Sequence, residues 1–228
     1  MKLTIFGATG GTGTHVVEQA LSAGHEVTAV VRDPARLRVA DRARVTAGAG
    51  VPGPAGSQAP RLRVVTADAM DPAAITGTVA DADAVICTLG PRGTGPTTVV
   101  QDGHRSIIAA MQRAGTRRLL SVSGSIAADD GESLYMRYLV KPLARATFLR
   151  HVCADFRTAE TAVRASGLDW TIFRPPALSN RPASGSYRTA IDRNLPHGFT
   201  VPRADLAACM LGTLTDPAAI HRHIGIAS

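Results

Sequence analysis

A glycine-rich turn near the N-terminus, between an apolar run and a helical pattern, restricts the fold more than any other feature. Residues Lys2 to Phe6 read as a buried parallel strand. Gly7, Gly10 and Gly13 follow, and glycine at such positions permits unusual backbone angles and close approach to another group. Apolar residues at helical spacing then predict a helix that ends at a C′ glycine (Val16, Val17, Ala20, Leu21; Gly24).

The alternation of strand and helix continues along the 228 residues. A second strand over His25 to Val31, with Pro34 opening the next helical turn, completes a βαβ unit. Further strands are predicted at 62–65, 82–89, 118–122, 170–173 and 224–227, and helices at 97–114, 155–165 and 203–214. This order predicts an α/β fold, a doubly wound and mostly parallel Rossmann sheet with helices on both faces. We expect a single domain over residues 1–228, with a substrate pocket formed by its C-terminal third.

The context of the glycine turn favours a dinucleotide-binding site. Free N–H groups and the helix dipole at the N-terminus of the first helix favour a negative charge. Spaced glycines in a βαβ unit let a diphosphate approach the backbone, so a purely structural turn is the weaker interpretation. The candidate residues are Gly7, Thr9, Gly10, Gly11, Thr12 and Gly13.

The end of the second strand bears on which nicotinamide cofactor is bound. A site for NAD places an acidic side chain there to hold the ribose hydroxyls. Here Arg32 stands at that point and Arg36 follows one helical turn later, and two guanidinium groups suit the 2′-phosphate of NADPH. Asp33 is an acid beside the candidate site, although it can also serve as the N-cap of the following turn.

Composition narrows the other classes of function. The formal net charge is +7, but the basic residues are scattered without a sustained run, which favours compositional bias or an anionic ligand over nucleic acid. Three cysteines and the pair His221 and His223 show no metal-ligand spacing, so no metal site is expected. No apolar stretch approaches the length of a membrane span or export signal, so we expect a cytoplasmic protein without membrane contact.

Several segments together resemble a known family. Residues 5–13, 30–33, 96–99, 166–172, 174–176 and 203–207 are similar to the atypical short-chain dehydrogenases, in particular the biliverdin-IXβ reductase and flavin reductase group. The resemblance implies that the glycine turn holds the diphosphate and that Arg32 and Arg36 hold the 2′-phosphate. It further implies that Asp68 and Ala69 lie beside the adenine and that Ser123 lies near the nicotinamide. The residues implied along the cofactor between them are Leu89, Gly90 and Arg92.

The chain also departs from this family. Gly124 replaces a serine, and Phe156 and Ala177 align with two pocket histidines, so biliverdin is not the expected substrate. Residues 126–150 differ as well and predict either a lid or a packing helix. Residues 47–60, rich in Gly, Pro and Ala, predict a disordered insertion away from the nicotinamide.

The standard short-chain dehydrogenases donate a proton from a tyrosine that has a lysine four residues later, and this sequence lacks that pair. None of the three tyrosines has a lysine four residues later, because Leu139, Pro142 and Ile191 stand there. Ser123 and Ser125 are the candidate catalytic residues, able to hydrogen-bond a substrate carbonyl, although a serine at a strand end equally often caps a turn.

The leading hypothesis is an NADPH-dependent oxidoreductase that transfers hydride to a flavin, a quinone or a similar aromatic or conjugated small molecule. A protein that senses NADPH without turnover, and an isomerase or lyase on the same fold, are the alternatives. The oligomeric state stays open.

Overall fold

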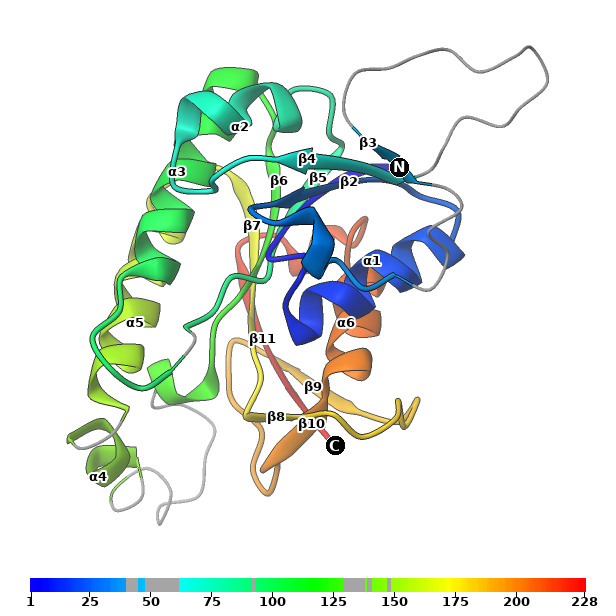
Figure 1. Cartoon of the computed structure of the whole chain (residues 1–228). Helices are drawn as coiled ribbons and strands as arrows, with labels where there is room; N and C mark the ends of the chain where they lie inside the picture. The colour runs from blue at the N-terminus through cyan, green and yellow to red at the C-terminus, as the bar shows by residue number, and fades with distance from the viewer. Residues whose placement is uncertain (40–44, 48–61, 92, 129–137, 139–140, 147–148) are drawn as a thin grey trace.

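The computed structural model has a single nine-stranded sheet between two layers of helices (Figure 1). It describes residues 1–39, 45–47, 62–91, 93–128, 138, 141–146 and 149–228. A separate two-stranded sheet pairs β10 (Thr200–Pro202) with β8 (Ala177–Ser179). The strand order of the main sheet is β3 (Val45–Ala47), β4 (Leu62–Thr66), β2 (Glu26–Val31), β1 (Lys2–Phe6), β5 (Ala84–Cys87), β6 (Arg118–Val122), β7 (Asp169–Arg174), β11 (Arg222–Ala227) and β9 (Arg188–Ile191). Every pairing in the main sheet is parallel except that of β11 with β9. The predicted doubly wound, mostly parallel α/β fold is confirmed.

The first strand of the chain, β1, lies near the centre of the sheet, and the later strands lie on its two sides. The central strands are β1 (Lys2–Phe6), β2 (Glu26–Val31), β4 (Leu62–Thr66), β5 (Ala84–Cys87), β6 (Arg118–Val122), β7 (Asp169–Arg174) and β11 (Arg222–Ala227). The order changes direction between β1 and β5, whose residues Leu3 to Phe6 pair with Ala84 to Cys87. In an open parallel sheet, ligands bind outside the carboxyl ends of the strands at this switch point.

Two sets of helices bury the two faces of the sheet (Figure 1). Helices α1 (Gly11–Ser22) and α6 (Arg203–Gly212) share one apolar core cluster, to which Val16, Val17, Leu206 and Met210 belong. Helices α2 (Pro72–Val79), α3 (Val99–Ala114) and α5 (Arg150–Arg164) share the other, with Ile75, Ile107, Met111 and Val163. Because both faces are covered, the central strands read as continuous apolar runs.

Two of the helical segments end or begin at local signals in the sequence, and a third is capped by a residue distant in the sequence. Gly24 has φ +85° and follows α1, as the predicted C′ glycine should. Asp33 caps the 3₁₀ turn η1 (Pro34–Arg36) by accepting a hydrogen bond from the Ala35 amide at 3.0 Å, so this possible role is confirmed. The buried carboxylate of Asp155 on α5 caps α3 by accepting from the amides of Val100 and Gln101 at 3.1 and 2.8 Å.

Some elements differ from the sequence-based expectation. The structure adds α2 and the short strands β3 (Val45–Ala47), β8 (Ala177–Ser179), β9 (Arg188–Ile191) and β10 (Thr200–Pro202), and α5 begins five residues before the predicted helix. The predicted insertion at 47–60 lies outside the described residues beyond Ala47. Most of the predicted lid also lies outside them; its described parts include the 3₁₀ turn η3 (Ser125–Ala127) and helix α4 (Lys141–Ala146).

None of the helices within the described residues is both long and apolar enough to cross a membrane. The three cysteines, Cys87, Cys153 and Cys209, are buried and free.

Candidate functional site

The glycine turn is a tight cradle at the switch point of the sheet. Gly7 has a left-handed φ of +79°, and the amide of Gly10 donates to its carbonyl at 2.9 Å. A Cβ on Gly7 would lie 2.7 Å from Oγ1 of Thr88, the residue that follows β5. A Cβ on Gly13 would collide with the Gly7 carbonyl oxygen and would lie 2.8 Å from the same Oγ1. Glycine is required at both positions because the turn after β1 packs on the end of β5.

The N-terminus of α1 opens from this cradle without a side-chain cap. Its N-cap is Gly10, which makes no side-chain capping hydrogen bond. The hydroxyl of Thr14 instead donates back to the carbonyl of Gly10 at 3.0 Å. Thr9 is half-buried beside the turn, and Thr12 is buried in the first turn of the helix. The free N–H groups and the helix dipole can therefore hold an anionic group of a ligand.

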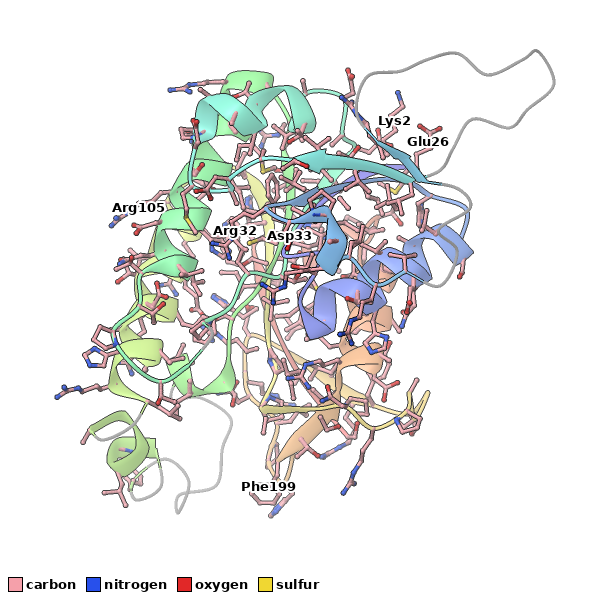
Figure 2. All side chains as sticks on the ribbon, in the orientation of Figure 1. Lys2, Glu26, Arg32, Asp33, Arg105 and Phe199 are labelled. Carbon is pink, nitrogen blue, oxygen red and sulfur yellow. The ribbon has the colours of Figure 1, made fainter. Side chains whose placement is uncertain are left out.

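Arg32 and Arg36 lie at the carboxyl end of the neighbouring strand β2. Both side chains are exposed; Arg32 directly follows the strand, and Arg36 ends η1. Figure 2 shows Arg32 and Asp33 as neighbours below β4. The two arginines are exposed cations on either side of the capping residue Asp33, an arrangement that suits an anion.

The other predicted cofactor residues line the same edge of the sheet. Asp68 and Ala69 follow β4, and the Asp68 carboxylate accepts from the amide of Met70 at 3.1 Å. Leu89 and Gly90 follow β5, and Leu89 packs closely against Gly103 of α3. Arg92 lies outside the described residues.

The two candidate catalytic serines have different surroundings. Ser123 follows β6, is 5% exposed, and donates its amide to the Phe173 carbonyl at 2.8 Å. Its Oγ is buried and has no well-formed hydrogen bond among the described residues. Ser125 opens η3; its amide donates to the Pro175 carbonyl at 2.8 Å, and its own carbonyl accepts from Nδ2 of Asn194 at 3.3 Å.

A buried ionic cluster, which the sequence analysis missed, lies directly behind Ser123. Arg174, at the end of β7, donates to both oxygens of the Glu160 carboxylate on α5, from Nε at 3.0 Å and from Nη2 at 2.6 Å. Nε2 of His223 on β11 lies 3.7 Å from the same carboxylate. The one available signal was an acidic residue at an apolar position of an amphipathic helix, four residues after Phe156 and three before Val163.

The charges of this cluster are mutually stabilised. Burial on its own would raise the pKa of Glu160, but the hydrogen bonds and the charge of Arg174 outweigh it and hold that pKa below its ordinary value. Burial lowers the pKa of His223, and the nearby Arg174 cation lowers it further. Glu160 is therefore an anion at neutral pH, a structural partner of Arg174 rather than a proton donor.

Two of the three departures from the resembled family, Gly124 and Phe156, lie side by side. A Cβ added to Gly124 would lie 3.6 Å from the ring of Phe156, an ordinary contact. Gly124, which replaces a serine of that family, thus lies beside Phe156, which replaces a histidine, and this wall of the site is apolar. Ala177 is exposed at the start of β8 and belongs to the other small sheet.

The switch-point cradle, the uncapped helix and the parallel sheet define a Rossmann-type NAD(P)-binding protein. The chain matches the NAD(P)H-binding family over residues 7–217 and belongs to that family. The resemblance drawn from the sequence is confirmed at this level.

Several known proteins and solved structures are similar to the chain. An uncharacterized chloroplastic protein of Arabidopsis thaliana is 30% identical over 193 residues, which cover 81% of this chain and 62% of the relative, so the chain spans less than two thirds of that protein. The anaerobillin reductase ChuY of Escherichia coli O157:H7 is 24% identical with a TM-score of 0.72, over 99% of this chain and 97% of that one. A short-chain dehydrogenase/reductase of Veillonella parvula, solved in complex with NADP, is 18% identical with a TM-score of 0.76, over 100% and 94%. At these identities, the two solved structures establish the fold.

Proposed function

We propose that this chain is an NADPH-dependent reductase that transfers hydride to a flavin, a quinone or a similar conjugated small molecule. The observation that carries the proposal is the pairing of the glycine cradle with two exposed arginines after β2, while the neighbouring acid Asp33 is occupied as a cap. The NADP complex of the Veillonella protein supports the same choice of cofactor.

The cofactor residues divide by the part of the dinucleotide that they would bind. The amides at the start of α1, with Thr9 and Thr12, hold the diphosphate, and Arg32 and Arg36 hold the 2′-phosphate. Asp68 and Ala69 border the adenine, and Leu89, Gly90 and Arg92 follow the cofactor toward the nicotinamide. The assignment of Arg92, which lies outside the described residues, rests on the sequence; the others rest on the positions of the residues at the carboxyl edge of the sheet.

Bound NADPH supplies the hydride. The chain's own contribution is orientation and the exclusion of water. Phe156 and Gly124 offer an apolar surface against which a flat acceptor can pack. Ser123 and Ser125 close β6 beside it and are the candidates for positioning a carbonyl of the acceptor. A conjugated acceptor delocalises the charge that it gains, so water can protonate it afterwards.

A protein that binds NADPH without turnover is the second candidate. The burial of the Ser123 hydroxyl beside Glu160 favours it, because this serine then has a structural environment. We also propose that the protein acts in the cytoplasm on a small-molecule substrate.

A steady-state screen of NADPH oxidation separates the two candidates. FMN, FAD, quinones and enones are offered in turn, with a Gly13→Ala variant as the control for oxidation that does not need the cradle. A reductase oxidises NADPH with at least one acceptor well above this control. Tight NADPH binding with no acceptor above the control would contradict the reductase and support the sensor.

A further inference from the structure

Arg203, the first residue of α6, lies over the start of α1. A Cβ on Gly11 would lie 2.7 Å from Cδ and 2.8 Å from Nε of Arg203, and 3.6 Å from the guanidinium carbon. Gly11 carries no left-handed φ, so its backbone would accept a side chain. Gly11 therefore leaves room for this arginine, whereas Gly7 and Gly13 leave room for backbone and Thr88.

The position of Arg203 is fixed from both sides. Its Nη1 donates to Oδ1 of Asn180 at 2.6 Å and to the carbonyl of Leu178 at 3.3 Å. The next residue is tied to α1, because Nε2 of Gln19 donates to the carbonyl of Ala204 at 2.9 Å. The two helices also share one core cluster. The guanidinium is thus held beside the glycine turn before any ligand binds.

The charge of Arg203 has the wrong sign for the place that it occupies. It stands at the N-terminus of its own helix and beside the N-terminus of α1, where a helix dipole disfavours a cation. Within the described part of the chain, no carboxylate forms an ion pair with it, and its two hydrogen bonds go to neutral oxygens. An anion bound at the start of α1 would offset this unfavourable interaction between the Arg203 cation and the helix dipoles.

We propose that Arg203 is a ligand of the cofactor diphosphate, contributed from the far end of the chain. The inference rests on the proposed binding of NADPH and adds a cation to a site otherwise made of backbone amides. Leu178 lies in β8, and Asn180 directly follows that strand. The same guanidinium therefore also connects the diphosphate to the C-terminal part of the site. Gly11 is glycine so that this connection can form.

The test measures dissociation constants of NADPH and NADH by calorimetry for the wild type and five variants. Arg203→Met removes the charge, and Gly11→Ala displaces the guanidinium without changing it. Both should weaken both dinucleotides by the same factor, about tenfold to a hundredfold, the range for hydrogen bonds to charged groups. Their double variant should lose little more than either alone, because both remove one interaction.

Two variants serve as controls. Arg105→Met removes an arginine from the outer side of α3 (Figure 2), with a side chain that is 59% exposed, and should bind like the wild type. Arg32→Gln should weaken NADPH alone, because NADH has no 2′-phosphate. Thermal unfolding of each variant without ligand verifies folding, and Gly11→Ala retains the test if Arg203→Met does not fold.

Each outcome has one meaning. Equal weakening of both dinucleotides in Arg203→Met and Gly11→Ala supports the inference. Wild-type affinity in either variant, or a loss restricted to NADPH, overturns it. A wild type that binds both dinucleotides but reduces no acceptor overturns only the proposed reductase, and a wild type that binds neither overturns both.

Discussion

The glycines of the turn at residues 7–13 are constrained for different reasons. Gly7 needs a left-handed φ, and Gly13 faces the Gly7 carbonyl and Thr88. Gly11 faces only the flexible side chain of Arg203. Substitutions at these positions should therefore differ in what they damage, even though the residue type is the same.

Gly13→Ala should destabilise the protein and abolish cofactor binding. The added methyl group overlaps backbone that cannot move without shifting β1 against β5, so we expect a loss of about 1–3 kcal/mol in the free energy of unfolding, as for other overpacked sites. Urea denaturation and calorimetry with NADPH measure the two effects. Gly77→Ala, in α2 with open space around it, is the matched control and should leave affinity unchanged. Wild-type stability and affinity in Gly13→Ala would show that the cradle has been misread.

Ser123→Ala and Ser125→Ala should each lower kcat/KM by about tenfold or less, roughly 1.4 kcal/mol of transition-state stabilisation. A general acid would typically contribute about 10²–10⁴-fold. Ser123 is buried beside Glu160, and the amide of Ser125 is held by Pro175, so both serve the backbone at the end of β6. The variants are assayed with the best acceptor from the screen. A thousandfold loss in either variant, with NADPH binding intact, would identify a true proton donor.

At the scale of elements, one buried ion pair joins α5 to the end of β7. Glu160 and Arg174 have side chains that are 5% and 7% exposed, and His223 adds a contact from β11. Two charges taken out of water in this way are worth little as a pair, but each is costly without its partner. The pair therefore fixes α5 behind the candidate serines rather than adding stability to the fold as such.

Glu160→Gln should cost about 3–5 kcal/mol of unfolding free energy at neutral pH, because it removes the anion that accepts two hydrogen bonds from the buried guanidinium of Arg174. Asp169→Asn, which breaks the exposed pair with Arg117, should cost far less. Since the folded pKa of Glu160 lies below its ordinary 4.5, the stabilisation is present above that pH and disappears as the pH falls through the folded pKa. The difference between wild type and Glu160→Gln should shrink in that acidic range. A difference that does not change with pH would contradict the assigned ionisation.

Strands buried on both faces could be predicted closely from the sequence. β1 and β6 have the predicted bounds, because continuous apolar runs mark them without reference to other parts of the chain. The short strands β8, β9 and β10 could not be predicted, since they are half-exposed and depend on partners distant in sequence. Helix α2 was missed because only Ile75 and Val79 are buried, although Asp71 and Pro72 give a good N-terminal signal.

The residues of the candidate site also divide into those that the local sequence predicts and those that only the fold brings together. The glycine cradle and the capping role of Asp33 follow from neighbouring residues, and the sequence predicts them. The approach of Arg203 to Gly11, and of Arg174 to Glu160, brings together residues that no local pattern connects. Side-chain contacts over such separations require the fold itself.

At the scale of the whole molecule, the stability should depend on pH through the histidine behind the site. The folded pKa of His223 lies below its ordinary 6.5, chiefly because of burial, so the unfolded chain binds more protons just below that pH. This residue therefore makes the protein less stable as the pH falls from 6.5 toward the folded pKa, and has no such effect above 6.5. In His223→Gln this contribution is absent, so denaturation curves across the range should show a shallower decline than in the wild type. Parallel declines in the two proteins would contradict the prediction.

Because β1, β2 and β6 run in the same direction, the turn after β1, the arginines after β2 and the end of β6 lie at one edge of the sheet. We propose that this edge binds NADPH in preference to NADH. The decisive measurement is a calorimetric titration with each dinucleotide, with Arg32→Asp as the comparison. We predict that the wild type binds NADPH more tightly by about 1–3 kcal/mol, the range for hydrogen bonds to charged groups, and that Arg32→Asp loses this preference. Equal affinities in the wild type, or an Arg32→Asp variant that still prefers NADPH, would contradict the claim.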